Sequence, residues 1–262
     1  MLPPLVEPAA HPLDLSDVEC WVVPRTVGDM VGAGRARDAV MEGMFRPADI
    51  DRAELGEVES IAVPIFRFEG TVSSFSIGMT ETVRTIRTGP DVGVLGGGGR
   101  TPPRSPKKRL STRRHILPTG GFSHQSRVEH VLARRGFPVD PSAKIAIRPA
   151  DLVKTPFDEL DPAATVLPDI DEADAAETAR LALQHRGHPK GNALFAKVDV
   201  ELDPGRLCFY PLYVLRYRYG GEAVDGGDKT FFVAVSGTTG KVVASEHPPF
   251  FRSVASKIRS WF

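Results

Sequence analysis

Apolar and polar residues alternate most regularly in the last quarter of the chain. At 194–202 every second residue is apolar and three charged residues lie between them, which is typical of a half-buried strand. A D-P-G turn at 203–205 leads into a second strand at 207–219, with tyrosines on one face and arginines on the other. Two further apolar runs, 230–236 and 241–244, are joined by a G-T-T-G turn. This order predicts a β-meander.

The N-terminal region combines a short strand pattern with a weak helical one. Residues 20–23, C-W-V-V, predict a strand that ends at a proline. Either Thr26 or Asp29 can begin the helix that follows. The residues expected to face the core from this helix are Val27, Met30, Val31, Val40 and Met44. Glycines at 28, 32 and 34 lower the helix propensity of the segment.

The middle of the chain carries further strand signals. Apolar runs recur over 61–86 and predict β-structure there. Pro64 marks a sheet edge or a bulge within this segment, because proline has no N–H for the ladder. Residues 144–148, K-I-A-I-R, predict one more short strand.

Two segments carry signals for the start of a helix. Ser126 and Glu129 form a capping box, which predicts a helix containing Val128, Val131 and Leu132. The strongest helix is predicted over about 172–186, with Asp171 as its cap and Gly187 as its stop. The apolar side of this second helix consists of Ala176, Ala179 and Leu183.

Together these elements predict an α+β fold, in which helices pack on antiparallel β-meander sheets. We expect one core over 16–247, preceded by a flexible, proline-rich lead-in at 1–15. A mobile loop at about 91–125 interrupts this core, because its G-G-G-G and P-P runs do not favour regular structure. An amphipathic helix at 248–262 follows it.

Composition narrows the function classes. The chain has 33 Lys and Arg against 33 Asp and Glu, and this zero net charge argues against a general polyanion binder. Cys20 and Cys208 lie in apolar runs, where we expect two reduced thiols, as suits a reducing compartment; a disulfide between them is the alternative. The first 15 residues lack the features of a signal peptide, and no stretch reaches the roughly 20 apolar residues of a membrane span. The main body is therefore predicted to be cytoplasmic.

A basic segment lies inside the predicted loop, and no acid occurs between Asp91 and Glu129. Its charged residues are Arg100, Arg104, Lys107, Lys108, Arg109, Arg113 and Arg114. They could contact nucleic acid or anionic lipid, although no aromatic residue is interleaved to stack on bases. They could also dock on an acidic stretch of the same chain or of a second copy, or remain a solvated loop. The acidic stretch comprises Asp158, Glu159, Asp161, Asp169, Asp171, Glu172, Asp174 and Glu177.

Motifs for catalysis, cofactors and metals are weak. The glycines at 96–99 lack the lysine of a P-loop, and prolines follow where its helix would begin. The G-T-T-G-K run at 237–241 lies between two predicted strands and indicates a hairpin turn. His185 and His188 straddle a helix end, and two ligands do not make a metal site. We therefore predict no catalytic residue, no cofactor, no metal and no small-molecule substrate.

The C-terminal thirteen residues form one amphipathic stripe with a basic opposite side. The residues expected to contact a membrane or a partner are Phe250, Phe251, Val254, Lys257, Ile258, Arg259, Trp261 and Phe262. Such a helix can lie in an anionic membrane interface, fill a groove on a partner protein, or pack on its own domain. An isolated helix of this length is marginal in water, so its apolar side needs a cover.

Two segments resemble a known bacterial family. They are I-A-V-P-I-F at 61–66, and 209–219 together with the strand and G-T-T-G-K hairpin at 231–243. In outline, 18–246 resembles the core of zinc-ribbon-bearing, often membrane-anchored proteins that are frequently labelled primosomal helicases. The resemblance implies a membrane-associated adaptor with no enzymatic residues to carry over. This chain has no Cys-x-x-Cys ribbon and ends where family members often continue into membrane spans.

The leading hypothesis is a non-enzymatic bacterial adaptor that binds another protein, peripheral at the inner membrane through its C-terminal helix. One alternative is a nucleic-acid-associated module that acts through 100–114. A second alternative is a hydrolase whose site is assembled only in three dimensions, which would require a pocket with converging histidines and carboxylates.

Overall fold

The computed structural model describes residues 13–15, 18–42, 50, 53–87, 110–189, 193–219 and 229–246, without the side chains of 80–87 and 110–116. The described residues form two compact units. Unit 1 comprises 1–71, 126–183 and 201–262, and unit 2 comprises 72–125 and 184–200. The single core predicted over 16–247 is thus divided in two.

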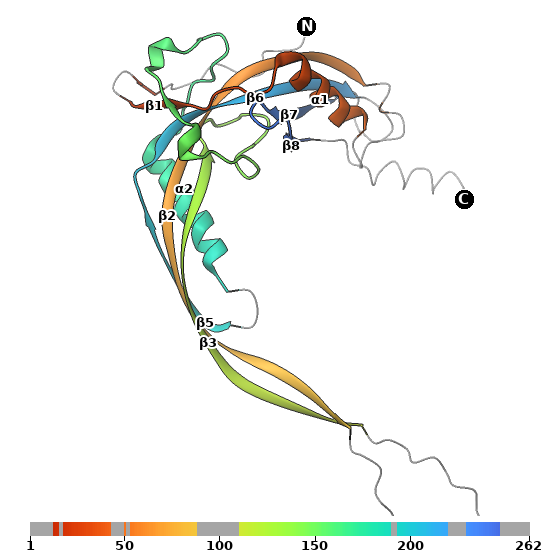
Figure 1. Cartoon of the computed structure of the whole chain (residues 1–262), viewed down its shortest axis with the longest axis vertical. Coiled ribbons are helices and arrows are strands. Elements are labelled where there is room, and N and C mark those ends of the chain that lie inside the picture. Colours follow the sequence, from red (N-terminus) through yellow and green to blue (C-terminus); the bar gives the residue numbers. More distant parts are fainter. Residues whose placement is uncertain are drawn as a thin grey trace, which may run out of the picture. The chain divides into compact units, whose positions relative to one another are not determined.

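The chain has the predicted α+β fold (Figure 1). The elements that lie within the described residues are two α-helices, two short 3-10 helices and eight strands. The strands are β1 (Cys20–Val22), β2 (Glu54–Arg87), β3 (Leu110–Leu132), β4 (Val153–Lys154), β5 (Ala193–Leu202), β6 (Arg206–Tyr219), β7 (Lys229–Ser236) and β8 (Val242–Ser245). The helices are α1 (Asp29–Met41), α2 (Glu172–Gly187), η2 (Pro149–Asp151) and η3 (Phe157–Glu159). The sheet order is β3-β2-β6-β1-β4, with β7 pairing to β6 and β8, and β5 pairing to β2.

Strand β6 is the centre of unit 1. It pairs antiparallel with β2 and β7, and parallel with β1. Every residue from Leu207 to Leu215 is buried, so both faces of this strand lie in a core. On one face Tyr213, Leu215 and Tyr217 pack with Ala36 and Val40 of α1. Because β6 is covered on both sides, its apolar residues run almost without interruption.

The opposite face of β6 carries a second set of buried residues. Cys208, Tyr210 and Leu212 belong to a cluster that includes Ile145 and Ile147 from the loop before η2. On the same face as Tyr213, Phe209 belongs to a third cluster with Ala175 and Ala179, which lie on the buried side of α2. Cys20 and Cys208 are buried free thiols, as predicted.

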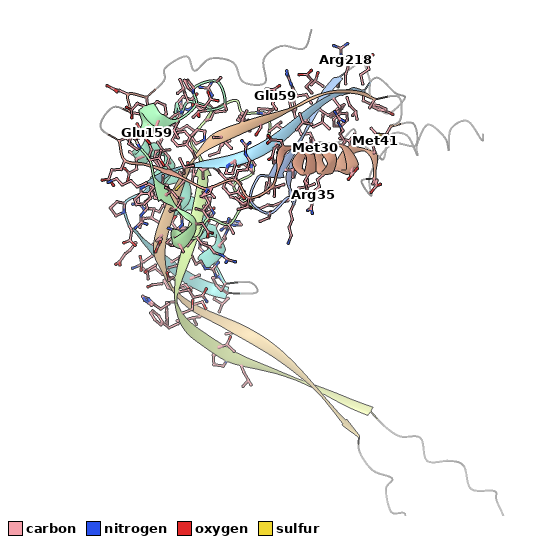
Figure 2. All side chains as sticks on the ribbon, turned by 45° about the horizontal axis from the view of Figure 1, so that its top comes forward. Met30, Arg35, Met41, Glu59, Glu159 and Arg218 are labelled. Carbon is pink, nitrogen blue, oxygen red and sulfur yellow. The ribbon has the colours of Figure 1, made fainter. Side chains whose placement is uncertain are left out.

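The predicted core face of α1 is only partly correct, because Val40 is buried as expected but Met30 and Val31 are not. Met30 is 91% exposed and Val31 is 54% exposed, whereas Gly32, Ala36 and Val40 are buried (Figure 2). The small residues face the sheet because the helix lies very close to Tyr213. A Cβ atom at Gly32 would be 2.2 Å from Cδ2 of that ring. Val27 is partly buried, and Met44 lies outside the described residues.

The helix predicted from the Ser126–Glu129 capping box is also wrong, because this segment belongs to β3. Residues 110–125, which were expected in the mobile loop, are part of the same strand. A capping box is a local signal, and strand pairing with β2 outweighs it here. The rest of the predicted loop, through residue 109, lies outside the described residues.

Two smaller strand predictions are corrected. Residues 145–148 form no strand, although Ile145 and Ile147 are buried. Pro64 marks no bulge, because β2 pairs continuously with β6 through this position. Ala62 donates its N–H to Ala164 at 2.7 Å, on the side away from β6. Residue 64 is two positions further along, so its backbone nitrogen also points away from β6. The N–H that proline lacks is therefore not needed for the hydrogen bonds between β2 and β6.

The C-terminal strands occur where the alternation predicts them, but only β6, β7 and β8 form a meander. Strand β5 pairs with β2 and not with β6. Helix α2 is confirmed within one residue at its C-terminal end, and the Asp171 carboxylate accepts the N–H of Asp174 at 2.8 Å as its cap. Ala179 and Leu183 are buried as expected, and Ala175 rather than Ala176 is the third buried residue.

Candidate interaction surface

Both surfaces singled out from the sequence fall largely outside the described residues. The C-terminal set at 250–262 and the basic residues at 100–109 are among those not described, and Arg113 and Arg114 fall on β3. In the described part of the chain, no helix is long and apolar enough to cross a membrane.

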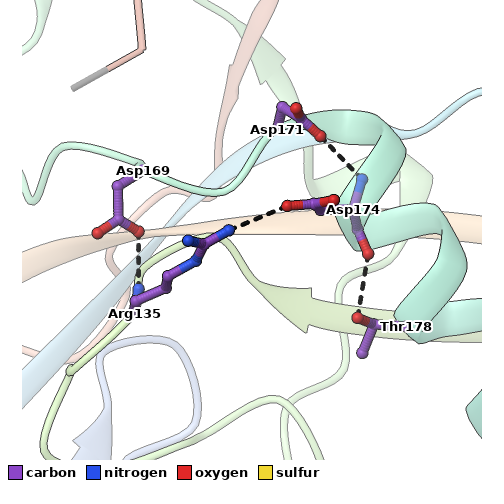
Figure 3. A network of polar contacts seen from close by, with 5 residues as sticks. All are labelled: Arg135, Asp169, Asp171, Asp174 and Thr178. Atoms are coloured by element: carbon purple, nitrogen blue, oxygen red, sulfur yellow. Dashed lines mark hydrogen bonds and ion pairs between the residues drawn. The ribbon is translucent and has the colours of Figure 1, made fainter. Parts of the chain in front are cut away.

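The acidic stretch already has partners within unit 1 (Figure 3). The Asp169 carboxylate accepts the backbone N–H of Arg135 at 2.7 Å and lies 3.3 Å from the Arg134 guanidinium. The Asp174 carboxylate accepts a bond from Arg135 Nη2 at 2.9 Å. Asp169 and Asp174 therefore hold the loop after β3 against the start of α2, and Asp171 caps that helix. These acids therefore form stabilising contacts within unit 1.

An open hollow of about 280 Å³ lies beside β8 in unit 1. Asp140, Lys144 and Glu246 are its ionisable residues, and no histidine lines it. It therefore does not supply the converging histidines and carboxylates that a hydrolase would need. Across the described residues, no group of three or more His, Cys, Asp or Glu is arranged to hold a metal ion.

Unit 2 contains a small sheet, in which β2 lies between β3 and β5. One face of this sheet is covered by the end of α2. A Cβ atom at Gly187 would lie 2.7 Å from Val198 Cγ1 and 2.8 Å from Val72 Cγ1. The helix end therefore packs against these two valines, and Val72 is only 3% exposed.

Two hydroxyl contacts define how β2 and β3 pair in unit 2. Ser73 Oγ is 2.9 Å from His124 Nδ1, and Ser74 Oγ is 2.9 Å from Ser123 Oγ. The partner number falls by one as the β2 number rises by one, so the strands are antiparallel. One step further in this register, Phe75 lies opposite Phe122.

The other face of this sheet, which no described segment covers, carries large apolar side chains. Phe75, Ile77 and Met79 alternate along β2 and are 43%, 44% and 51% exposed. Phe122 on β3 is 71% exposed and Phe195 on β5 is 55% exposed. The rings of Phe75 and Phe195 meet edge to face with centroids 6.4 Å apart, so the patch crosses from one strand to the next. We call these five residues the apolar face.

Polar pairs border the apolar face. On one side lies the Ser73–His124 contact. On β5, Lys197 Nζ is 2.9 Å from Asp199 Oδ2, and both side chains are largely exposed. An apolar centre with a polar rim is the usual composition of a protein–protein interface.

The apolar face was missed from the sequence, although a signal for it exists. Phe75, Ile77 and Met79 alternate with Ser74, Ser76 and Gly78, which identifies a strand but not which side is covered. Phe195 is more informative, because it lies in the same phase as Lys197 and Asp199 on β5. An aromatic residue in the polar phase of a half-buried strand indicates an exposed apolar contact point.

No protein-family model matches this sequence, and no curated protein or solved structure matches it either.

Proposed function

We propose that this protein is a non-enzymatic adaptor that binds another protein through the apolar face of unit 2. The observation that supports this proposal is the exposure of Phe75, Ile77, Met79, Phe122 and Phe195 on one uncovered sheet face. Contiguous apolar patches on ordered surfaces mark interaction sites more often than scattered apolar residues do.

The energetics favour covering this face. Fully burying one phenylalanine, isoleucine or methionine side chain contributes about 1.5–3 kcal/mol. Each of the five is already partly buried, so a partner would gain a fraction of that amount per residue. Phenylalanine has few rotatable bonds, and β2 holds its side chains in place, so little conformational entropy is lost on binding.

The form of the surface favours a protein partner over other ligands. Small-molecule sites are concave, whereas this patch lies on an open sheet face. Binding to a phosphate backbone requires Lys or Arg side chains, and among the described β5 residues bordering the face the lysine is already paired with Asp199. A flat aromatic centre with a polar rim suits an apolar segment of another protein.

The experiment compares capture by the full chain with capture by surface variants. The chain is immobilised, extract of the source organism is passed over it, and retained proteins are quantified by mass spectrometry. Phe75→Ser with Phe122→Ser should reduce at least one retained protein by about tenfold, as expected for the loss of two central aromatic residues. The matched control is Met30→Ser with Leu181→Ser, which removes two exposed apolar residues of unit 1.

The affinity of a purified partner should then be unchanged by the unit 1 control pair and lowered by the unit 2 pair, Phe75→Ser with Phe122→Ser. If the unit 2 variant retains the same proteins in the same amounts as the unmodified chain, the proposal is wrong. Circular dichroism of each variant verifies that the fold is intact.

We propose further that the adaptor is peripheral at a membrane through 250–262. Support for this part comes from the sequence alone, in which apolar residues alternate at helical spacing with Arg252, Lys257 and Arg259. Removal of 248–262 should reduce co-sedimentation with vesicles that contain anionic lipid. Equal co-sedimentation of the truncated and full chains contradicts membrane binding and leaves the apolar-face proposal untouched.

A further inference from the structure

The outer edge of β5 offers a second interaction surface, different from the apolar face. Among the described strands, β5 pairs only with β2, so its other edge is open. The strand spans ten residues, Ala193–Leu202, and contains neither proline nor glycine. The strand on the other side of β2, β3, has Pro118, Gly120 and Gly121 in unit 2. Proline and glycine hinder edge pairing, and β5 lacks them.

The hydrogen-bonding phase of β5 follows from the turn after it. Asp203 donates its N–H to the carbonyl of Glu69 on β2 at 2.9 Å. Alternate residues in a strand direct their backbone groups to opposite edges, so the odd-numbered residues of β5 face β2. The even-numbered residues Ala196, Val198 and Val200 therefore direct their N–H and C=O groups to the open edge. Alternating burial along 196–202 agrees with a strand without a bulge.

The charges on β5 specify a partner. Lys197 and Asp199 lie on the same face on either side of Val198. If a second β5 pairs antiparallel about Val198, each lysine lies opposite the aspartate of the other copy. Val198 would then be a hydrogen-bonded pair with its own copy, as its outward backbone groups require. The two Lys–Asp pairs would occupy non-hydrogen-bonded positions, where side chains are closest.

Neighbouring registers are less favourable. A pairing centred on Lys197 would set lysine against lysine. One centred on Asp199 would bring Lys197 opposite Glu201 but would set aspartate against aspartate at its centre. A pairing centred on Val200 would set Asp199 against Glu201. A pairing centred on Ala196 sets Lys197 against Phe195 and leaves Asp199 without a cation opposite it. Of these registers, only the one centred on Val198 brings opposite charges together twice without setting like charges against each other.

We infer that a second copy of this chain binds the open edge of β5, antiparallel and centred on Val198. The symmetry axis stands perpendicular to the sheet, so the two apolar faces lie on the same side of one continuous sheet. The inference goes beyond the proposed adaptor function and holds whether or not another protein binds the apolar face. A dimer would double that face and so strengthen binding to a partner with two or more copies of its apolar segment.

The test uses charge reversal at the two exposed positions, measured by sedimentation equilibrium of the full chain. The unmodified chain should dimerise. K197D and D199K should each raise the dimer Kd by about tenfold or more, because each creates two like-charge pairs across the strands. An equimolar mixture of K197D and D199K should regain a Kd close to that of the unmodified chain, because every cross-strand pair in the mixed dimer has opposite charges.

The mixing step separates pairing between chains from an effect within one chain, since both single variants lose the same internal ion pair. F75S with F122S serves as a second control, and it should leave the dimer Kd within about threefold, because neither residue lies on the edge. A chain that stays monomeric at all concentrations overturns the inference. A dimer whose Kd is unchanged by K197D and D199K also overturns the inference, as does a dimer that F75S with F122S abolishes. Failure of partner capture in the earlier experiment leaves these outcomes unaffected.

Discussion

β5 and β6 are consecutive strands with opposite surroundings. β6 is buried on both faces from Leu207 to Leu215 at the centre of unit 1, whereas β5 has no fully buried residue in unit 2. Both strands are rich in apolar residues, so composition does not separate them. The difference is in the number of layers, because unit 1 covers both faces of its sheet, whereas no described segment covers one face of the sheet in unit 2. The adaptor proposal accordingly assigns stability to unit 1 and partner binding to the exposed apolar side chains of unit 2.

The largest expected effect comes from truncating one phenylalanine in each unit. Phe209 is 0% exposed and packs on Phe157, with ring centroids 5.9 Å apart. Phe209→Ala should lower the free energy of unfolding by about 3–5 kcal/mol, because it leaves a cavity in a packed core. Phe122→Ala should change it by no more than about 0.5 kcal/mol, as expected for an exposed side chain.

Urea denaturation followed by circular dichroism measures both variants. A large loss of stability in Phe122→Ala would show that the apolar face is part of a core, and would remove the contrast between the units.

The second effect concerns the close contact between α1 and β6. The Tyr213 ring cannot move easily, because its hydroxyl donates to the Val27 carbonyl and lies 3.0 Å from Asp29 Oδ1. Gly32→Ala would place a methyl group against this ring and should cost about 2 kcal/mol relative to Gly34→Ala. Gly34 has no atom within 4 Å of an added Cβ. Its replacement by alanine should stabilise the helix by up to about 1 kcal/mol.

The two glycine variants differ only in what the new methyl group meets, so helix propensity cancels between them. Equal free energies of unfolding for Gly32→Ala and Gly34→Ala would contradict the close contact.

The sequence predicted unit 1 better than unit 2, and the reason is physical. Period-two alternation locates a strand, and the long apolar run of β6 also indicates burial on both faces. The same alternation at Phe75, Ile77 and Met79 does not say whether anything covers those side chains, because coverage depends on layers formed by distant residues. The Ser126 capping box failed for a related reason, since the pairing of β3 with β2 is not a local property. The close approach at Gly32 is not a local property either, because it depends on Tyr213, which is distant along the chain.

The third effect compares two serines. Ser236 is 0% exposed, and its Oγ accepts the N–H groups of Thr238 at 3.2 Å and Thr239 at 3.0 Å. It also shares a hydrogen bond of 2.7 Å with the Tyr210 hydroxyl. Ser236→Ala should cost about 1–3 kcal/mol, because buried donors lose their acceptor. Ser123→Ala in unit 2 removes one contact with Ser74 near the surface and should cost no more than about 0.5 kcal/mol.

The same denaturation assay applies to both serine variants, with the unmodified chain as the reference. An equal loss in the two would mean that the G-T-T-G turn does not depend on Ser236, contrary to the network of contacts around it.

The smallest effect is a pH dependence that belongs to unit 1, where both cysteines lie. Burial raises the pKa of the Cys208 thiol to about 12, only partly offset by the nearby Arg67 and Arg206 charges. An unfolded thiol ionises near pH 8.5–9, so between that pH and 12 the unfolded chain loses its proton first. Fewer protons bound in the unfolded state mean that stability falls as pH rises. From pH 8 to 9.5 the loss in the free energy of unfolding that is assigned to Cys208 should be roughly 1 kcal/mol.

Cys208→Ala should remove this part of the pH dependence, and Met30→Ser, which alters an exposed residue of the same unit, should retain it. Urea denaturation at pH 8, 9 and 9.5 measures the three chains. An identical slope in Cys208→Ala and the unmodified chain would mean that the thiol is not held protonated by burial in the core, and that β6 is less enclosed than its contacts indicate.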